Sequence, residues 1–443
     1  MDRISHTIIK IAKYMRALII WFTVAVVVGC FCGLIGSAFH IGVDKATEIR
    51  TAAPWLLLCM PAAGIVIVLV YKLFRTEGQG TNDIIDAAYS GSSLSIGLVP
   101  SIFIGTVLTH LVGGSSGREG AALQMGGDIG YHVGRLFHLR NQDMKVATMC
   151  GMAAFFSALF GTPFAAAVFS IMVVSVGSFL HMAFLPCFVA AFTAYIISVH
   201  LGVVPMHFDI IVPALSVSLF LRTAVLSLSF ALVSTVFCTF LHTTEGLFRK
   251  GFLKNPYIRA VAGGIIIIAL TYLCGTADYN GAGTAVIRAA VEDGTARPEA
   301  FLLKLLFTAV TLSAGYKGGE IIPSFFVGAT FGCVAAPLLG VPAGFGAALG
   351  MIGVFCGATN CMFSSIVLAV ELFGAEGLMF FALVCGVTYM VSGYSGLYST
   401  QTILFSKIGA DYLEVKTNHH HLGDRHDPVP AARNRGTEID TEG

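Results

Sequence analysis

The stretch GSSGREGAALQMGG, residues 114–127, sets Arg118 and Glu119 between glycines inside a strongly apolar chain. An ionised carboxylate is costly to bury in apolar surroundings, so a glutamate at such a place is by default functional. A structural ion pair between the two neighbours is the alternative. Which of the two applies depends on the chain around them.

That chain has the composition of a membrane protein. Of its 443 residues, 56% are hydrophobic and only 12% are charged, about half the charged fraction of a soluble domain. Apolar runs cover residues 17–43, 54–74, 96–112, 179–199, 216–241, 261–274, 347–372 and 379–390. Runs of about 20 residues can span a bilayer as helices, and the shorter runs indicate tilted, broken or re-entrant helices. The composition therefore predicts an all-α polytopic membrane protein.

Both ends of the chain are polar. Arg3, Lys10, Lys13 and Arg16 precede the first apolar run, and this positive charge places the N-terminus in the cytoplasm. The tail switches to charged residues and proline, a composition typical of disorder. We expect a cytoplasmic segment at residues 1–16, membrane repeats at 17–205 and 206–410, and a cytoplasmic disordered tail at 411–443.

The sequence gives little support for cofactors or other partners. The eleven cysteines sit in or beside apolar segments without a regular Cys-x-x-Cys pair, as small buried apolar residues do. Three adjacent histidines, His419 to His421, lie in the tail, where such residues are more often unstructured than metal ligands. The formal net charge of +1 does not indicate a nucleic-acid partner. We expect no cofactor and no bound metal.

The chain repeats itself at an interval of about 200 residues. GQGTNDIIDAAYSG, residues 78–91, matches GAGTAVIRAAVEDG, residues 281–294, without gaps. Further along, GREG meets GGEI, which sets Glu119 against Glu320, and CGMAAFFSA meets CGATNCMFS, which sets Cys150 against Cys356. Duplicated halves in transporters are often inverted, with the substrate site between them. The alternative is that the glycines only allow close helix packing.

Glycine-preceded helix starts can bind an anion. A helix that begins in the membrane leaves its first N–H groups unpaired and carries about half a positive charge there. One such end contributes at most about 2 kcal/mol, whereas desolvating a small ion costs on the order of 20 kcal/mol, so several ends must converge. The candidates are the starts near Gln79, Gly117 and Ile321. Side-chain hydroxyls can donate further hydrogen bonds to the anion, and the candidates are Ser115, Ser116, Tyr394 and Tyr398.

Glu119 stands where the anion should enter, and its carboxylate is itself an anion. The side chain can therefore occupy the anion position and leave it when protonated or displaced. This competition couples proton binding to anion binding without covalent chemistry.

These motifs resemble the CLC family of chloride channels and anion/proton antiporters, over most of the chain up to about residue 410. GREG at 117–120 resembles the family's Gly-Lys/Arg-Glu-Gly-Pro motif, whose glutamate is the external gate. GQGTN resembles Gly-Ser-Gly-Ile-Pro, GGEIIP resembles Gly-Gly-Ile-Phe-Ala-Pro, and LYS at 397–399 resembles the segment with the anion-coordinating tyrosine. VLAVELFG resembles a segment whose glutamate is structural, so we keep its Glu371 off the site.

The resemblance implies a CLC-like inverted repeat of two halves with many tilted and broken helices, present as a homodimer in the plasma (inner) membrane. It implies Glu119 as gate and proton acceptor, and Glu320 as second proton site. The expected anion-binding residues are Gln79, Gly80, Gly117, Arg118, Gly120, Ile321, Ile322 and Tyr398. The tail is too short for cytoplasmic CBS domains.

Departures from the family pattern concern the substrate. Gln79 replaces a serine of chloride-selective members and Ala121 replaces a proline, while Met172 and Val173 stand where antiporters carry an internal proton-transferring glutamate. Glu320 is similar to a glutamate of the fluoride/proton antiporter branch that takes part in coupling. Ile322 and Gln79 do not match the threonine and methionine usual in that branch, so chloride and fluoride both stay open.

The leading hypothesis is a proton-coupled exchanger of a small halide, chloride or fluoride, and the alternative is a passive anion channel. No Walker-type loop is present, so uphill transport must use an ion gradient. An intramembrane hydrolase using Ser115 or Ser116 with His110 is a remote alternative, because no acid is spaced to orient the base; we do not expect an enzyme. A cation path through Asp86, Asp128, Asp209 and Asp278 is equally remote, since these residues lie near apparent loops or helix ends.

Overall fold

The computed structural model describes residues 2–409 and 411–418, which form helices with three short strands. The first half contains α1 (Asp2–Ala52), η1 (Pro54–Cys59), α2 (Met60–Leu73), α3 (Thr81–Ser90), α4 (Leu98–Leu111), α5 (Glu119–Leu136), α6 (Asn141–Phe160), α7 (Pro163–Met172) and α8 (His181–His200). The second half contains α9 (Val217–Phe248), η2 (Gly251–Lys254), α10 (Pro256–Cys274), α11 (Thr284–Glu292), α12 (Ala300–Ser313), α13 (Ile321–Ala335), η3 (Ala336–Leu339), α14 (Ala343–Thr359), α15 (Met362–Phe373) and α16 (Leu378–Val391). The strands are β1 (Ser175–Val176), β2 (Thr402–Phe405) and β3 (Tyr412–Lys416).

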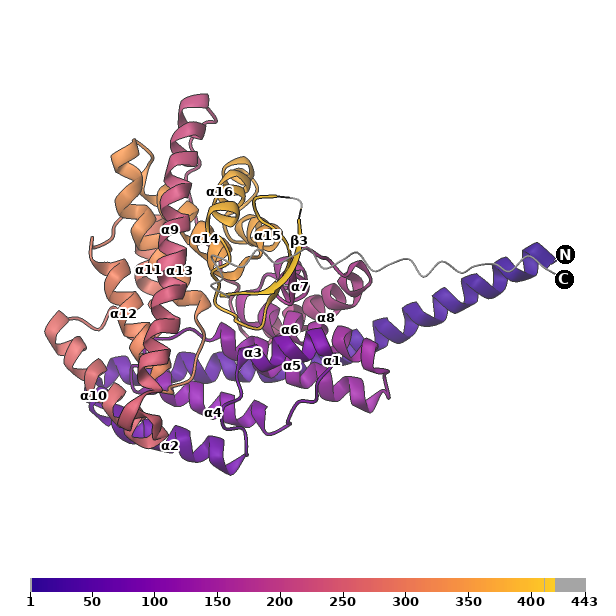
Figure 1. The fold of residues 1–443 in the computed structure, drawn as a ribbon, viewed down its shortest axis with the longest axis horizontal. Coiled ribbons are helices and arrows are strands. Elements are labelled where there is room, and N and C mark those ends of the chain that lie inside the picture. Colours follow the sequence, from indigo (N-terminus) through magenta and orange to yellow (C-terminus); the bar gives the residue numbers. More distant parts are fainter. Residues whose placement is uncertain (1, 410, 419–443) are drawn as a thin grey trace.

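The helices of the first half recur in the second. In Figure 1, the indigo to magenta helices α1 to α8 fill the lower part, and most of the later, orange to yellow helices lie above them. α12 and α13 begin 202 residues after α4 and α5, and α11 begins 203 residues after α3. α13 packs against α14 as α5 packs against α6. The chain is therefore an inverted repeat of two halves, as predicted.

Glycines set the close packing inside each half. The carbonyl oxygen of Gly151 on α6 occupies the place where a Cβ on Gly126 of α5 would lie. The carbonyl oxygen of Gly350 on α14 does the same at Gly328 of α13. Small residues let membrane helices approach closely, so these glycines have the packing role that we weighed as an alternative.

The predicted equivalence of Cys150 and Cys356 in the two repeats is wrong. Because Gly151 and Gly350 occupy equivalent places, the counterpart of Cys150 is Leu349. The match that set Cys150 against Cys356 is displaced by about two helical turns.

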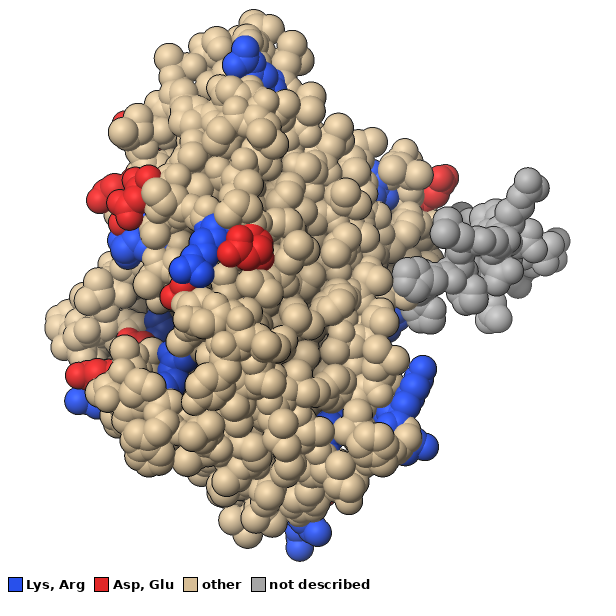
Figure 2. Space-filling model, turned by 90° about the vertical axis from the view of Figure 1, so that its left-hand side faces the viewer, with Lys and Arg blue, Asp and Glu red and all other residues tan. Residues whose placement is uncertain are grey.

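The surface and the helix lengths fit a bilayer. Among the described residues, seven helices are long and apolar enough to cross a membrane. The apolar helices α4, α7, α12, α14, α15 and α16 are shorter, as expected for broken or tilted segments. Figure 2 shows small groups of charged side chains separated by a broad uncharged surface. The predicted all-α polytopic membrane fold is confirmed.

α1 is longer than the apolar run that predicts it. Its 51 residues extend over about 76 Å, more than twice the thickness of the hydrocarbon core. The first part of the helix projects away from the other helices (Figure 1). Residues 2–16, expected as a separate segment, are thus continuous with the first membrane helix.

The three strands form a small sheet in the order β1-β2-β3. β1 pairs in parallel with β2, and β2 pairs antiparallel with β3. β3 falls within the segment that we expected to be disordered, so that expectation is wrong for residues 412–416, which find a pairing partner in β2. His419 to His421 lie outside the described residues.

Candidate functional site

The two halves meet at a pair of glycines. The Gly117 amide donates to the Gly319 carbonyl and the Gly319 amide donates to the Gly117 carbonyl, both at 2.7 Å. Around this pair, the Ser115 amide donates to Thr311 Oγ1 at 3.1 Å and the Lys317 amide donates to Thr109 Oγ1 at 3.0 Å. Each of these hydrogen bonds turns into its partner when every residue is replaced by the one 202 positions away in the other half. A local two-fold axis therefore passes between the starts of α5 and α13.

Glu119 is the first residue of α5, and its side chain crosses to the other half. Its Oε2 accepts a hydrogen bond from the amide of Ile322, in the first turn of α13, at 3.3 Å. The residue has no solvent exposure, and in the described part of the chain its Oε1 has no hydrogen-bond partner. A Cβ on Gly117 would overlap Oε2, so glycine makes room for the carboxylate there. The carboxylate thus lies at the positive start of α13.

Glu320 crosses in the opposite direction. It precedes α13, and its Oε2 lies 3.2 Å from the place of a Cβ on Gly120, in the first turn of α5. This oxygen is buried without a hydrogen-bond partner. Each carboxylate therefore reaches the helix start of the other half.

The two glutamates are not at equivalent positions, however, contrary to the sequence match. α5 begins at Glu119, whereas α13 begins one residue after Glu320. The Gly117–Gly319 pair makes Ile321 the counterpart of Glu119 and Arg118 the counterpart of Glu320. The residue just before the helix is therefore positively charged at α5, where it is Arg118, and acidic at α13, where it is Glu320.

A cavity of about 300 Å³ reaches this centre, and Gln79, Gly80, Glu320 and Tyr398 lie in its wall. Gln79 Oε1 and Tyr398 Oη are buried and have no hydrogen-bond partner among the described residues, so both side chains are available to a ligand. Glu119 does not line the cavity and lies between α5 and α13. Four of the predicted residues are therefore brought together around one polar space.

Three predicted anion ligands already have partners. The Gly117 amide is used by Gly319, and the Gly80 amide donates to Asp83 Oδ2 at 2.7 Å. Arg118 Nη1 donates to Asp44 Oδ1 at 2.7 Å, so its guanidinium pairs with α1 and not with Glu119. Gly117 and Gly120 contribute room for the neighbouring backbone and carboxylates, and the amides of Gly117 and Gly80 are not free to bind an anion directly.

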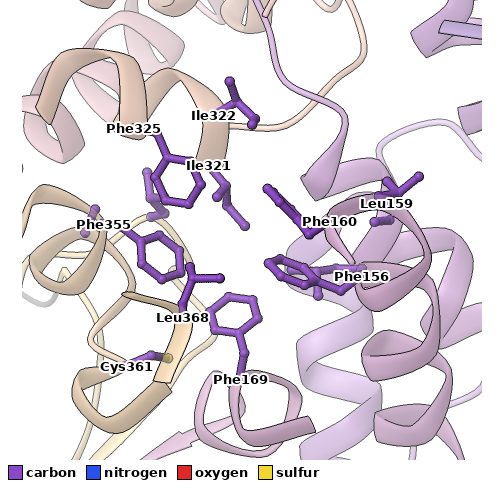
Figure 3. Close-up of a cluster of buried hydrophobic side chains, with 14 of the residues drawn as sticks. Phe156, Leu159, Phe160, Phe169, Ile321, Ile322, Phe325, Phe355, Cys361 and Leu368 are labelled. Atoms are coloured by element: carbon purple, nitrogen blue, oxygen red, sulfur yellow. The ribbon is translucent and has the colours of Figure 1, made fainter. Parts of the chain in front are cut away.

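Ile321 and Ile322 begin α13 above an apolar cluster. Figure 3 shows the Ile321 side chain between Phe325 of the same helix and Phe160 of α6, whereas the Ile322 side chain lies apart from these rings. The rings of Phe160 and Phe325 are 6.1 Å apart, and those of Phe325 and Phe355 are 5.1 Å apart. Both isoleucines are buried, so their side chains keep water from this helix start while the Ile322 amide faces Glu119.

Sequence reasoning missed several polar residues of the cavity wall, among them Gln124, Lys317 and Arg259. Gln124 lines the cavity and donates from Nε2 to Thr81 Oγ1 at 2.9 Å. It stands four residues after Gly120, on the same face of α5, a spacing that could have indicated it. Lys317 and Arg259 also line the cavity. The lysine of KGGE in an apolar chain was a usable signal, whereas Arg259 lies far from every motif.

Neither serine of the hydrolase alternative is paired with His110. Ser115 Oγ is 3.1 Å from Thr308 Oγ1, and His110 Nδ1 is 2.9 Å from the Thr106 carbonyl. Ser116 Oγ has no hydrogen-bond partner, so the described residues contain no serine–histidine dyad at these positions.

Tyr394, a candidate hydroxyl for anion binding, lies elsewhere. Its Oη is 3.4 Å from Ser406 Oγ, and the residue does not line the cavity.

The remaining carboxylates are structural or dispersed. Glu371 accepts from the amides of Phe164 and Ala165, at 3.0 and 2.8 Å, and so caps the start of α7. Asp128 was expected near a helix end but is buried within α5, 3.3 Å from His132 Nε2. In the part of the chain that the structure describes, no three His, Cys, Asp or Glu residues gather as a metal site would require.

Two inverted repeats with broken helices that start at a shared, carboxylate-filled centre define an inverted-repeat membrane transport protein. The chain belongs to the voltage gated chloride channel family, whose sequence model matches residues 62–393. It is 36% identical over 397 residues to the "Chloride/fluoride channel protein" of Pseudomonas syringae pv. tomato, which covers 87% of each chain. It is 27% identical to an "H(+)/Cl(-) exchange transporter" of Yersinia pestis, over 79% of each chain.

Solved structures agree with this membership. The crystal structure of a CLC-type fluoride/proton antiporter matches with a TM-score of 0.84 and 34% identity, over 87% of this chain and 98% of that one. A slow cyanobacterial Cl−/H+ antiporter, at 18% identity and a TM-score of 0.71, shares the fold. The predicted family and its inverted-repeat architecture are both confirmed.

Proposed function

We propose that this protein exchanges a small halide, with fluoride preferred, for protons. Glu119 serves as gate and proton acceptor, and Glu320 as the second proton site. The observation that carries the proposal is the contact between Glu119 Oε2 and the Ile322 amide at 3.3 Å, because it sets a carboxylate at the start of a helix from the other repeat.

The exchange follows from competition for that helix start. The ionised Glu119 carboxylate and a halide are both attracted by the unpaired amides of α13, and both cannot bind there together. Protonation removes the charge of Glu119, so the side chain leaves and the anion enters. One helix start is too weak alone, and the Tyr398 hydroxyl, whose Oη is buried without a hydrogen-bond partner among the described residues, can donate a further hydrogen bond to the anion. The Gln79 amide would donate through its Nε2.

Glu320 provides the proton step on the cavity side. It lines the cavity and reaches the first turn of α5, while Met172 and Val173 cannot carry a proton. The relatives whose names include fluoride are 34% and 36% identical to this chain, against 27% for the chloride exchanger, which favours fluoride. We further propose a non-enzymatic homodimer in the plasma membrane with both termini cytoplasmic.

Flux from reconstituted vesicles tests the exchange. An outward fluoride gradient, imposed with no proton gradient, is expected to drive protons uphill into the vesicle. Chloride and nitrate gradients of equal size, measured at several pH values, establish selectivity. Proton movement that only follows the membrane potential, and disappears when the potential is clamped, contradicts antiport.

A passive anion channel is the second candidate. Met172 and Val173 favour it, because the position of the internal proton-transferring glutamate has no titratable group. In that case fluoride moves with Glu119 as gate, and no gradient of anions drives protons uphill.

A further inference from the structure

Two cations without an ion-pair partner among the described residues line the cavity whose wall also contains Glu320, Glu245 and Asp83. Lys317 and Arg259 line the cavity of about 300 Å³ and also an adjoining cavity of about 250 Å³. Among the described residues, neither forms a salt bridge, whereas Arg249 in the same wall pairs with Glu245 at 2.5 Å. Unpaired charges are costly near a membrane interior, so their default interpretation is functional.

The fold holds Lys317 in place through its backbone. The Lys317 amide donates to Thr109 Oγ1, and the neighbouring Tyr316 Oη is within hydrogen-bond distance of the carbonyls of Met60 and Ala260, at 2.8 and 3.0 Å. The ammonium lies 4.1 Å from the centre of the Tyr71 ring. No hydrogen-bond acceptor among the described residues takes its protons, so the charge is available to a ligand in the cavity.

Arg259 lies on the second turn of α10, beside the same loop. Its Nη2 is 3.7 Å from the place of a Cβ on Gly315, a residue with φ of +100° that lines both cavities. Its Nε is buried and has no hydrogen-bond partner within residues 2–409 and 411–418. A buried N–H group without an acceptor favours the binding of a ligand, because leaving it unpaired costs about 1–3 kcal/mol.

Comparison of the two repeats shows that only the second half carries a cation at this loop position. The counterpart of Lys317 is Ser115, which makes the equivalent backbone bond to Thr311. Ser115 is fully buried, and its hydroxyl pairs with Thr308. The position that is buried and neutral at Ser115 in the first half thus carries the unpaired charge of Lys317 at a cavity in the second.

We propose that Lys317 and Arg259 form a binding site for a small inorganic anion, in which the transported halide is held before it reaches the centre between α5 and α13. The cavities have room for a hydrated halide and for inorganic phosphate. Phosphate binds the two cations but is too large and too charged to follow the halide, so it blocks the site. This inference rests on the proposed anion transport and concerns the approach of the anion, not its coupling to protons.

Variants of the two cations test the site in vesicles. Removing one unit charge several ångströms from an anion in a partly hydrated cavity is expected to raise the half-saturating fluoride concentration about five- to tenfold in Lys317→Gln and in Arg259→Gln. Lys317→Arg keeps the charge and is expected to stay within about twofold of the wild type. Inorganic phosphate on the cavity side is expected to inhibit the wild type and to lose this effect in both Gln variants.

Lys72→Gln is the matched control, because Lys72 is exposed, follows Tyr71 and lines neither cavity. Unchanged half-saturation in Lys317→Gln and Arg259→Gln, or an equal rise in Lys72→Gln, overturns the site. The proton-to-anion ratio is expected to stay at the wild-type value in all variants. A wild type that moves fluoride without protons refutes the proposed antiport but leaves this test intact, because its readout is anion affinity.

Discussion

Gly117 and Gly319 donate backbone hydrogen bonds to each other, both at 2.7 Å, at the point where the two repeats meet. This pair fixes the register between the halves and brings the first turns of α5 and α13 together. Each glutamate then reaches the other half, Glu119 to the Ile322 amide and Glu320 toward Gly120. The proposed anion site therefore requires both repeats, since each supplies a carboxylate to the helix start of the other.

Gly117→Ala should displace the gate. The added Cβ would overlap Glu119 Oε2 and lie 3.1 Å from Ile322 Cβ, so the carboxylate must leave the start of α13. We expect anion flux to rise or persist while the number of protons moved per anion falls about threefold, which corresponds to a loss of about 0.6 kcal/mol of preference for the bound carboxylate. Paired fluoride and proton flux measurements check this.

Gly386→Ala is the control for that variant, since a Cβ on Gly386 meets nothing within 4 Å. It is expected to keep the wild-type flux and coupling. Gly117→Ala with wild-type coupling would show that the carboxylate does not depend on the room that glycine leaves.

Glu320→Gln should separate the two transported species. The amide keeps the shape of the side chain but cannot take up a proton, so proton flux should fall about tenfold or more while fluoride flux stays within a few fold. Simultaneous recordings from a fluoride electrode and a pH electrode on one vesicle sample measure both. Equal loss of the two fluxes would assign Glu320 a structural role.

Glu371→Gln should reduce stability and leave coupling intact. Glu371 accepts from the amides of Phe164 and Ala165, and an amide side chain can accept only at its one oxygen and carries no charge. We expect a loss of about 2 kcal/mol, seen as a lower unfolding temperature in detergent. The exposed Glu376→Gln is the control, and it should unfold as the wild type does. A changed proton-to-anion ratio in Glu371→Gln would place this residue in the pathway.

Much of this arrangement could be predicted from the sequence. Composition gives the membrane class, and the matched segments at 78–91 and 281–294 give the duplication, because α3 and α11 begin at equivalent threonines. GREG and GGEI, which resemble family motifs, locate both helix starts. These features are local, since glycines and charges stand out in an apolar chain.

The rest depends on three-dimensional register and on partners distant in sequence. The alignment of GREG with GGEI sets Glu119 against Glu320. Only the Gly117–Gly319 hydrogen bonds show that Arg118 is the counterpart of Glu320. Arg118 pairs with Asp44, 74 positions earlier. Arg259 lies in a helix without any motif, and its place at the cavity follows from the packing of α10 against α2.

The most direct test of the central claim is the proton-to-fluoride ratio of Glu119→Gln, measured in vesicles against the wild type. Glutamine is expected to leave fluoride movement in place and to lower proton movement at least tenfold, to the level of empty vesicles, because a neutral amide neither binds a proton nor competes as an anion at α13. A Glu119→Gln protein that still moves protons uphill at the wild-type ratio would contradict the account.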